Sequence, residues 1–188
     1  GTGLNDGAYP AALIVAAGTS SCTTGKDNLY SWKNGVWSDL GTLGATYNGT
    51  AKGVSDDGTV AGTFLNININ TAVVVSSAGV LEVLPAPADV FDTVVMGISE
   101  DGLHIFGQIT FQPVDDIYEH YATRWNLDLT GDWNVELISP QQSYVSQGAW
   151  GASDDCSVIV GTSLYPDNNP DPVLRNNREG WIWMEGSP

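Results

Sequence analysis

Positive charge, histidine and cysteine are all scarce in this sequence. Its 188 residues contain 6 Lys and Arg against 22 Asp and Glu, for a formal net charge of −16, with 2 His and 2 Cys. An acidic surface of this kind repels phosphate backbones and anionic lipids, which argues against binding to nucleic acid or to a charged membrane surface. No apolar run reaches the ~18 residues that a transmembrane helix needs, so we expect no transmembrane segment.

Recognisable catalytic and metal-binding motifs are also missing. The chain has no Cys-x-x-Cys or His-Glu-x-x-His pattern, no Gly-x-Ser-x-Gly turn and no glycine-rich phosphate loop. The two histidines, His104 and His120, leave few partners for a zinc site or for a serine nucleophile. We therefore assign no catalytic residue, and we expect no cofactor other than Ca²⁺ at one loop.

Long helical stripes are absent, and short segments take their place. No stretch has the 3.6-residue periodicity of an amphipathic helix, whereas 22 Gly and 9 Pro divide the chain into short pieces. Hydrophobic residues at 42% and charged residues at 15% are typical of a folded core. We predict a single all-β domain over residues 1–188.

The two cysteines, Cys22 and Cys156, permit one disulfide. Composition alone leaves free thiols and a bridge equally open, but abundant Trp, Thr and Asn with few Lys favour export. Export in turn favours a bridge, because disulfides persist outside the cytoplasm. We predict an extracellular, periplasmic or cell-surface location and a Cys22–Cys156 disulfide.

What the chain does contain is internal repetition. The segment GVSDDGTVAGTF (53–64) recurs as GISEDGLHIFGQIT (97–110) and as GASDDCSVIVGTS (151–163), with a fainter copy at 3–20. Each copy has an acidic turn followed by a short apolar run that ends in Gly. The first glycines of the three clear copies are 44 and 54 residues apart, a period typical of propeller blades.

A second motif alternates with the first and completes each unit. The segment LYSWKNGVWSDLGTL (29–43) is echoed at 72–85, at 122–139 and, truncated, at 180–186. Each unit is then predicted to hold four strands, the third ending in the acidic turn and the fourth in the glycine. The repeat units are approximately 28–65, 72–110, 121–163, and 180–188 together with 1–20.

Four-stranded units of this size predict a β-propeller, because a meander sheet must cover both of its faces against neighbouring sheets. The chain starts with what resembles a last strand (11–19) and finishes with a first strand (180–184). We therefore predict four blades, closed by pairing of the N- and C-terminal strands. Part of a larger propeller and two chains in one ring are the alternatives, and the oligomeric state is left open.

The segment YSWKNGVWSDLGTLGATYNGTAKGVSDDGTVAGTF (30–64) resembles the HAF-type extracellular repeat. That pattern runs approximately as Phe/Ala-x-Trp, then Leu-Gly-x-Leu, then Ala-x-x-Val-Ser-x-Asp-Gly-x-x-Val-Gly. The match is close over 30–64 and good over 97–110 and 151–163, while the second unit lacks the first-strand Trp and Cys156 replaces the turn glycine. The resemblance implies a propeller of the kind expected in bacterial exported proteins and autotransporter passengers, and it implies no particular biochemical activity.

The paired acids of the turns, such as Asp56 and Asp57, are the obvious candidates for acid–base chemistry. A catalytic acid and base must converge on one reacting bond, whereas acids that recur once per unit are expected at equivalent places far from one another. Asp at a hairpin also accepts backbone N–H bonds, and Gly58 and Gly102 supply positive φ. We predict that these acids hold the turns and take no part in catalysis.

Two loops carry enough oxygen ligands to raise the question of Ca²⁺. The segment YPDNNPDP (165–172) holds Asp167, Asn168 and Asp171, and the insertion at 113–120 holds further carboxylates. None of the acidic turns has the ligand spacing of an EF-hand. We predict ordinary exposed loops, with Ca²⁺ bound by Asp167, Asn168 and Asp171 as the alternative.

Seven tryptophans are the remaining candidates for ligand contacts. Trp32, Trp125 and Trp183 recur on the first strand of their units, which predicts a core role between sheets. The other four lie off that register and could stack on a sugar ring where they are exposed. These candidate ligand-binding residues are Trp37, Trp133, Trp150 and Trp181.

The leading functional hypothesis is a non-enzymatic, exported binding or adhesion module whose loops contact a glycan or a protein. The loops that do not repeat, at 89–92, 111–120 and 164–179, are carried by a repeated scaffold, which is where binding residues commonly lie. One alternative is a polysaccharide-acting enzyme, a glycoside hydrolase or lyase, with carboxylates around the propeller axis. Another is a purely structural passenger domain.

Overall fold

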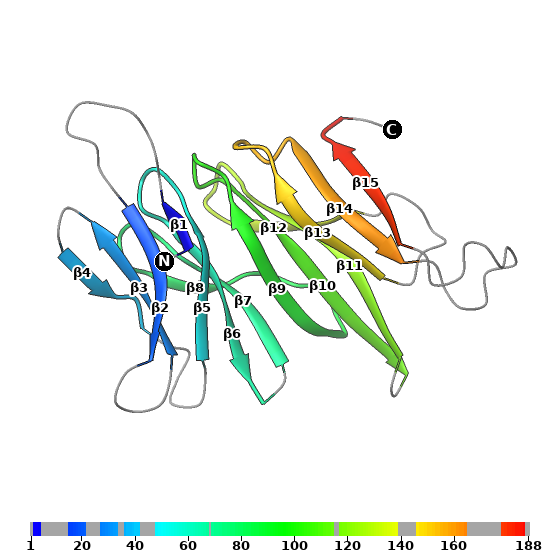
Figure 1. Ribbon diagram of the computed structural model, residues 1–188, viewed down its shortest axis with the longest axis horizontal. Coiled ribbons are helices and arrows are strands. Elements are labelled where there is room, and N and C mark those ends of the chain that lie inside the picture. The colour runs from blue at the N-terminus through cyan, green and yellow to red at the C-terminus, as the bar shows by residue number, and fades with distance from the viewer. Residues whose placement is uncertain are drawn as a thin grey trace, which may run out of the picture.

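The computed structural model describes residues 2–4, 15–21, 27–33, 36–41, 48–67, 69–114, 117–138, 146–164 and 178–186. Every regular element in these ranges is a β-strand, which confirms the all-β fold (Figure 1). Within the same ranges, no helix has the length and apolarity to cross a membrane. The strands are β1 (Thr2–Leu4), β2 (Val15–Ser21), β3 (Asp27–Lys33), β4 (Val36–Asp39), β5 (Asn48–Val54), β6 (Val60–Asn66), β7 (Ile69–Val75), β8 (Leu81–Val83), β9 (Val90–Ile98), β10 (His104–Val114), β11 (Ile117–Leu127), β12 (Trp133–Ile138), β13 (Ser146–Ala152), β14 (Val158–Leu164) and β15 (Arg178–Met184).

The strands form four antiparallel meanders that lie in a row along the molecule (Figure 1). The first sheet is β1–β4, the second is β5–β8 and the third is β9–β12, and in each one consecutive strands pair with one another. The described residues of the fourth sheet form three strands, β13–β15. A single parallel pair, His120 with Ser146, links the third and fourth sheets into one seven-stranded sheet.

The terminal strands do not pair as predicted. β15 pairs with β14, while β2 has β1 on one edge and β3 on the other, so β2 offers no edge to a C-terminal strand. The first and fourth sheets instead lie at opposite ends of the row (Figure 1). The cause is that β3 folds back on β2 rather than starting a new sheet. The sequence unit 28–65 therefore gives β3 and β4 to the first sheet and β5 and β6 to the second.

Each clear copy of the acidic motif forms the same kind of hairpin, namely β5–β6, β9–β10 and β13–β14. All three hairpins have a register shift at equivalent places in their first strand. A Cβ at Gly107 would lie 2.0 Å from the Val94 carbonyl oxygen, and one at Gly161 would lie 2.1 Å from the Gly148 oxygen. The glycine that ends each apolar run is thus required by the close approach of the neighbouring strand.

Three apolar cores fill the spaces between successive sheets. Phe64 lies in the first core, between the first and second sheets, Trp125 in the second core and Ile159 in the third. All three side chains are completely buried, and Trp125 Nε1 donates a hydrogen bond of 2.7 Å to the Pro85 carbonyl. The core role predicted for Trp125 is confirmed, and each inner sheet is covered on both faces by its neighbours.

Candidate functional site

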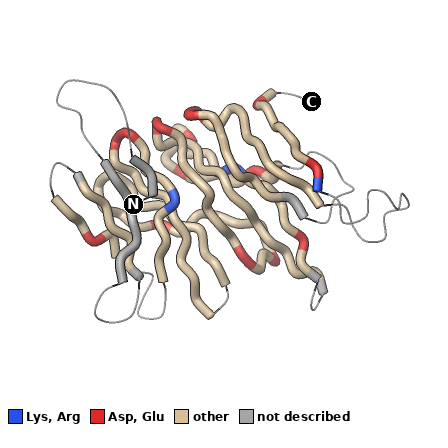
Figure 2. The backbone as a smooth tube through the Cα atoms, in the orientation of Figure 1, with Lys and Arg blue, Asp and Glu red and all other residues tan. Residues whose placement is uncertain are grey.

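The three acidic turns lie next to one another, contrary to the expected separation. The backbone N–H of Asp56 donates to the Glu100 carbonyl at 2.7 Å, and the N–H of Glu100 donates to the Asp154 carbonyl at 2.9 Å. The strands that lead into the turns, β5, β9 and β13, begin adjacent sheets, and β9 contacts both of the others, which brings the turns to one edge of the molecule (Figure 2). We call this edge the acidic rim. It comprises the turns at 55–58, 99–102 and 153–156.

One carboxylate in each turn of the rim is engaged by its own turn. Asp101 Oδ1 accepts hydrogen bonds from Ser99 Oγ at 2.6 Å and from the Leu103 N–H at 2.9 Å. Asp57 and Asp155 accept the same two bonds in their turns. Partial burial alone would raise the pKa of Asp57. Hydrogen bonds from Ser55 and from Thr59 outweigh that effect and hold this pKa below its usual value. These carboxylates serve as acceptors that hold the turns, as predicted.

The two histidines are hydrogen-bonded within the sheets. His104 Nδ1 lies 2.8 Å from Asn126 Oδ1, which is the satisfied strand histidine expected from the sequence. His120 Nδ1 lies 2.8 Å from Gln108 Nε2. Burial lowers the pKa of His120, and the nearby charge of Asp92 partly opposes that effect.

The metal prediction falls on a part of the chain that the structure does not describe. Asp167, Asn168 and Asp171 lie outside the described residues, so the ordinary loop predicted there stays a prediction, with Ca²⁺ as its alternative. In the described ranges, no three His, Cys, Asp or Glu side chains are grouped so that they could hold a metal ion.

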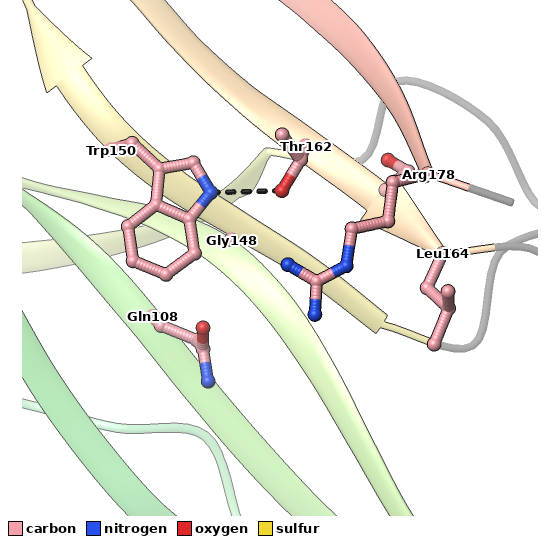
Figure 3. Close-up of a pocket in the computed structure, with 7 residues that line it drawn as sticks. Gln108, Gly148, Trp150, Thr162, Leu164 and Arg178 are labelled. Carbon is pink, nitrogen blue, oxygen red and sulfur yellow. Dashed lines mark hydrogen bonds between the residues drawn. The ribbon is translucent and has the colours of Figure 1, made fainter. Parts of the chain in front are cut away.

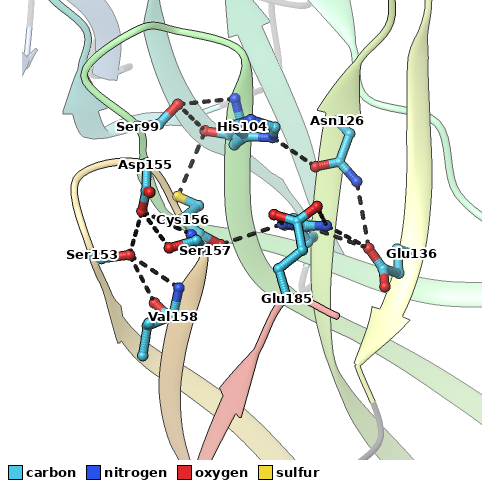
Figure 4. A network of polar contacts seen from close by, with 11 residues as sticks. Ser99, His104, Asn126, Glu136, Ser153, Asp155, Cys156, Ser157, Val158 and Glu185 are labelled. Carbon is cyan, nitrogen blue, oxygen red and sulfur yellow. Dashed lines mark hydrogen bonds and ion pairs between the residues drawn. The ribbon is translucent and has the colours of Figure 1, made fainter. Parts of the chain in front are cut away.

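A buried arginine on the third sheet pairs with one carboxylate of the third sheet and one of the fourth, Glu136 and Glu185, both of which Figure 4 labels. Arg124 on β11 is 4% exposed and pairs with Glu136 and Glu185, each at 3.1 Å. Its guanidinium also lies 4.6 Å from the centroid of the Trp183 ring. Both partner carboxylates remain about half exposed, so they are partly hydrated while the arginine is not. One of the few cations of the chain is therefore used to join two sheets.

Cys156 is a free and completely buried thiol. It replaces the turn glycine with a φ of 54°, and its side chain packs in the third core with Phe106 and Ile159. Burial raises the pKa of the thiol to about 12. The predicted disulfide to Cys22, which lies outside the described residues, is not seen.

The four candidate tryptophans lie on different strands and in different surroundings. Trp37 is 65% exposed on β4, and Trp133 on β12 lines a cleft between the second and third sheets. Trp181 packs into the third core, where its Nε1 has no hydrogen-bond partner among the described residues. Trp150 is 59% exposed on β13. The structure does not bring the four together at one site.

Trp150 lines a small pocket on the fourth sheet (Figure 3). Its Nε1 donates to Thr162 Oγ1 at 2.8 Å, and the side chains of Gln108 and Arg178 border the same space. The pocket measures about 80 Å³, whereas sites that enclose a small-molecule ligand commonly measure roughly 300–1,000 Å³. It is therefore too small to enclose a sugar ring.

A larger groove lies at the end of the strands opposite the acidic rim. β9 enters the third sheet at this end and β10 returns to it, so the β8–β9 connection and the β10–β11 hairpin meet there. The groove measures about 670 Å³, which is within the usual range for small ligands. We call it the loop groove. Its lining residues are Asp89, Phe111, Gln112, Pro113, Glu119, Tyr121 and Leu137.

Both aromatic rings and carboxylates line the loop groove. The rings of Phe111 and Tyr121 meet edge to face, with centroids 5.5 Å apart and an interplanar angle of 89°. The Tyr121 hydroxyl donates to Glu119 Oε2 at 3.0 Å, and burial together with this bond raises the pKa of Tyr121. Asp89 is held at a φ of 64° on the facing connection. The arrangement offers an apolar surface with hydrogen-bond acceptors beside it.

The extended hairpin that builds the groove is the main departure from the repeat. β10 and β11 have 11 residues each, against 7 in β6 and β7 of the second sheet. Two of the non-repeating loops, 89–92 and 111–120, thus contribute to one groove. Sequence reasoning identified these loops but not Phe111 or Tyr121, because its search for ligand contacts was confined to tryptophan. The position of Phe111 in a non-repeating segment, with Tyr121 directly after that segment, was the available signal.

The comparisons with known proteins support the fold alone. No family model and no curated protein matches the chain, so the resemblance to HAF-type repeats stays a prediction. A solved structure assigned as TolB from Agrobacterium tumefaciens matches with a TM-score of 0.53 and 16% identity, over 90% of this chain and 62% of that one. A GH43 endo-arabinanase from Bacillus licheniformis matches with a TM-score of 0.39 and 13% identity, over 94% and 71%. Both are β-propellers, and the first likeness supports a propeller fold.

Proposed function

We propose that the protein is a non-enzymatic, exported module that binds a neutral oligosaccharide in the loop groove. The observation that carries the proposal is the meeting of two aromatic rings and two carboxylates in one concave surface. Sugar rings present apolar C–H faces that pack on aromatic side chains, and their hydroxyls donate to carboxylates. Phe111 and Tyr121 supply the apolar surface, while Asp89 and Glu119 supply the acceptors.

Charge favours a neutral ligand over an anionic one. No Lys or Arg is among the described residues that line the groove, and the chain carries a formal charge of −16. A uronate or a sulfated glycan would be repelled by this field. The size of the groove also favours a short oligosaccharide over a protein, because a stable protein interface buries about 800 Å² on each partner.

The groove is held in shape by contacts within the protein. The hydrogen bond from Tyr121 fixes the Glu119 carboxylate, and the Phe91 and Tyr118 rings, with centroids 5.4 Å apart, fasten the hairpin to β9. Side chains that are already ordered lose less conformational entropy when a ligand binds. This preorganisation supports a binding role for the groove.

Glycan-array screening followed by isothermal titration calorimetry tests the proposal. Asp89→Asn and Glu119→Gln preserve side-chain shape, and Asn tolerates the positive φ at position 89. Because each change weakens a charged acceptor, we expect each to raise the dissociation constant roughly tenfold. Glu82→Gln, at an exposed position on β8, is the matched control and should leave the affinity unchanged. An array without hits, or affinities unaffected by both groove variants, would contradict the proposal.

Glycoside cleavage is the alternative function at the same groove, because Asp89 and Glu119 both line it. A hydrolase places two carboxyl groups about 5–10 Å apart across the scissile bond. Mass spectrometry of the bound oligosaccharide after prolonged incubation separates the two functions. An intact sugar supports binding alone, whereas fragments that are lost in Glu119→Gln would support a hydrolase.

An exported location and a role in adhesion belong to the same proposal. The location rests on the acidic, lysine-poor composition, and adhesion rests on the chemistry of the groove. Binding of the purified protein to intact cells, with competition by the groove ligand, tests adhesion. Cell binding that the free ligand does not displace would assign adhesion to another surface.

A further inference from the structure

In the part of the chain that the structure describes, the outer face of the fourth sheet exposes a group of apolar side chains. In the second sheet, Ala61 pairs with Val74 just before the repeated glycine, and both face the third sheet with 0% and 4% exposure. The equivalent pair in the fourth sheet is Val160 with Ile182, which are 41% and 67% exposed. Met184 extends the same face and is 51% exposed. Positions that are core in the middle of the row are therefore solvent-facing at its end. We call Val160, Ile182 and Met184 the fourth face.

The first sheet has a matching outer face. Leu29 on β3 points into the first core, so Trp32, three residues further on, points to the opposite side of the sheet. Trp32 in the first sheet has the same place in the strand register as Trp125 in the third sheet. The second sheet covers Trp125 completely. Trp37 lies directly opposite Trp32 on β4 and is 65% exposed. We call Trp32 and Trp37 the first face.

We propose that the fourth face of one chain packs on the first face of a second copy, and that two such junctions close a ring of two chains. The two faces correspond to the two halves of the second core. Val160 and Ile182 have the positions of Ala61 and Val74 on one side of that core, and Trp32 has the position of Trp125 on the other side. They cannot meet within one chain, since the first and fourth sheets lie at opposite ends of the row (Figure 1). A two-fold axis then makes both junctions identical and leaves neither face in water.

Size-exclusion chromatography with light scattering, over a series of protein concentrations, tests the ring on the full chain. We expect twice the mass of one chain. Ile182→Asp buries a charge at the junction and should raise the dissociation constant at least roughly 100-fold, giving a monomer. Trp37→Asp should do the same from the other side of the junction. Leu129→Asp, in the fully exposed β11–β12 turn, makes the same change of charge and should leave the dimer intact.

Four results would overturn the proposal. They are a monomer at every concentration, an Ile182→Asp variant that still dimerises, a dimer that survives Trp37→Asp, and a mass that grows beyond two chains with concentration. The third result would indicate pairing of two fourth faces, and the fourth an open chain of copies. Ile182 and Trp37 are exposed in the single chain, so circular dichroism and thermal unfolding should show both variants folded.

Discussion

The two ends of the strands differ in how closely they repeat. At the acidic rim, three turns from three sheets share one geometry, with serine-to-aspartate hydrogen bonds of 2.5, 2.6 and 2.6 Å. At the opposite end, the third sheet has 11-residue strands where the second has 7-residue strands. A turn that connects two strands, and a glycine that lets the next strand approach, are needed again in each sheet. A ligand-binding site is needed only once in the molecule. The hydrogen bonds of the turns give the repeated end a structural role, and the binding site that we propose lies at the end that differs.

The largest effect is expected where the repeat is tightest. In Gly107→Ala, the new Cβ would lie 2.0 Å from the Val94 carbonyl oxygen, and backbone cannot move aside as a side chain can. We expect the free energy of unfolding to fall by about 3 kcal/mol, measured by urea denaturation. Gly180→Ala is the control, because its Cβ would have its nearest neighbour at 3.9 Å. Equal stabilities of the two variants would contradict the role given to the repeated glycine.

Sequence reasoning predicted the locally encoded features and missed those that depend on distant partners. The turn at 55–58 was predictable because its serine, aspartate and glycine lie within four residues. The pairing of β3 with β2 was not predictable from the sequence. β3 could have paired with β2 or with a strand of its own repeat unit, and local sequence does not decide between these partners. The loop groove combines Asp89 with a hairpin more than 20 residues later, so only its loops, and not its lining, could be named in advance.

A smaller loss of stability is expected at the rim. Ser99 is 1% exposed, donates to Asp101 at 2.6 Å and accepts from the His104 N–H at 2.9 Å. Ser99→Ala leaves that N–H without its side-chain partner and should lower the free energy of unfolding by about 1–2 kcal/mol. Ser38→Ala, at an exposed position on β4, is the control. A loss at Ser99 no greater than that at Ser38 would show that the rim bonds contribute little.

The pH dependence of stability should be sensitive to His120, at the groove end of β11. Burial lowers the pKa of His120 below its usual 6.5, so the unfolded chain takes up the proton first as the pH falls through 6.5. The free energy of unfolding then falls, and this group contributes at most about 1.4 kcal/mol per pH unit. His120→Gln should show a shallower loss between pH 7 and pH 5 in thermal unfolding. If stability fell equally with pH in the parent protein and in His120→Gln, the effect of burial on His120 would be contradicted.

The effect expected at Cys156 is on the reactivity of its thiol and not on stability. Cys156 lies in the one turn of the rim that has no glycine. Burial raises the pKa of the thiol to about 12, so very little thiolate exists at pH 8. Iodoacetamide should leave Cys156 unmodified in the native protein and should modify it in urea without a reductant, as read by peptide mass spectrometry. A Cys156 that reacts in urea only after reduction would restore the disulfide.

The central claim is that the rim is structural and that the loop groove binds. Titration calorimetry with the oligosaccharide identified on the array, paired with thermal unfolding of the same samples, tests it most directly on Ser99→Ala and Glu119→Gln. We expect Ser99→Ala to melt at a lower temperature with an unchanged dissociation constant, and Glu119→Gln to bind roughly tenfold more weakly with an unchanged melting temperature. Loss of binding in folded Ser99→Ala, together with normal binding in Glu119→Gln, would contradict it.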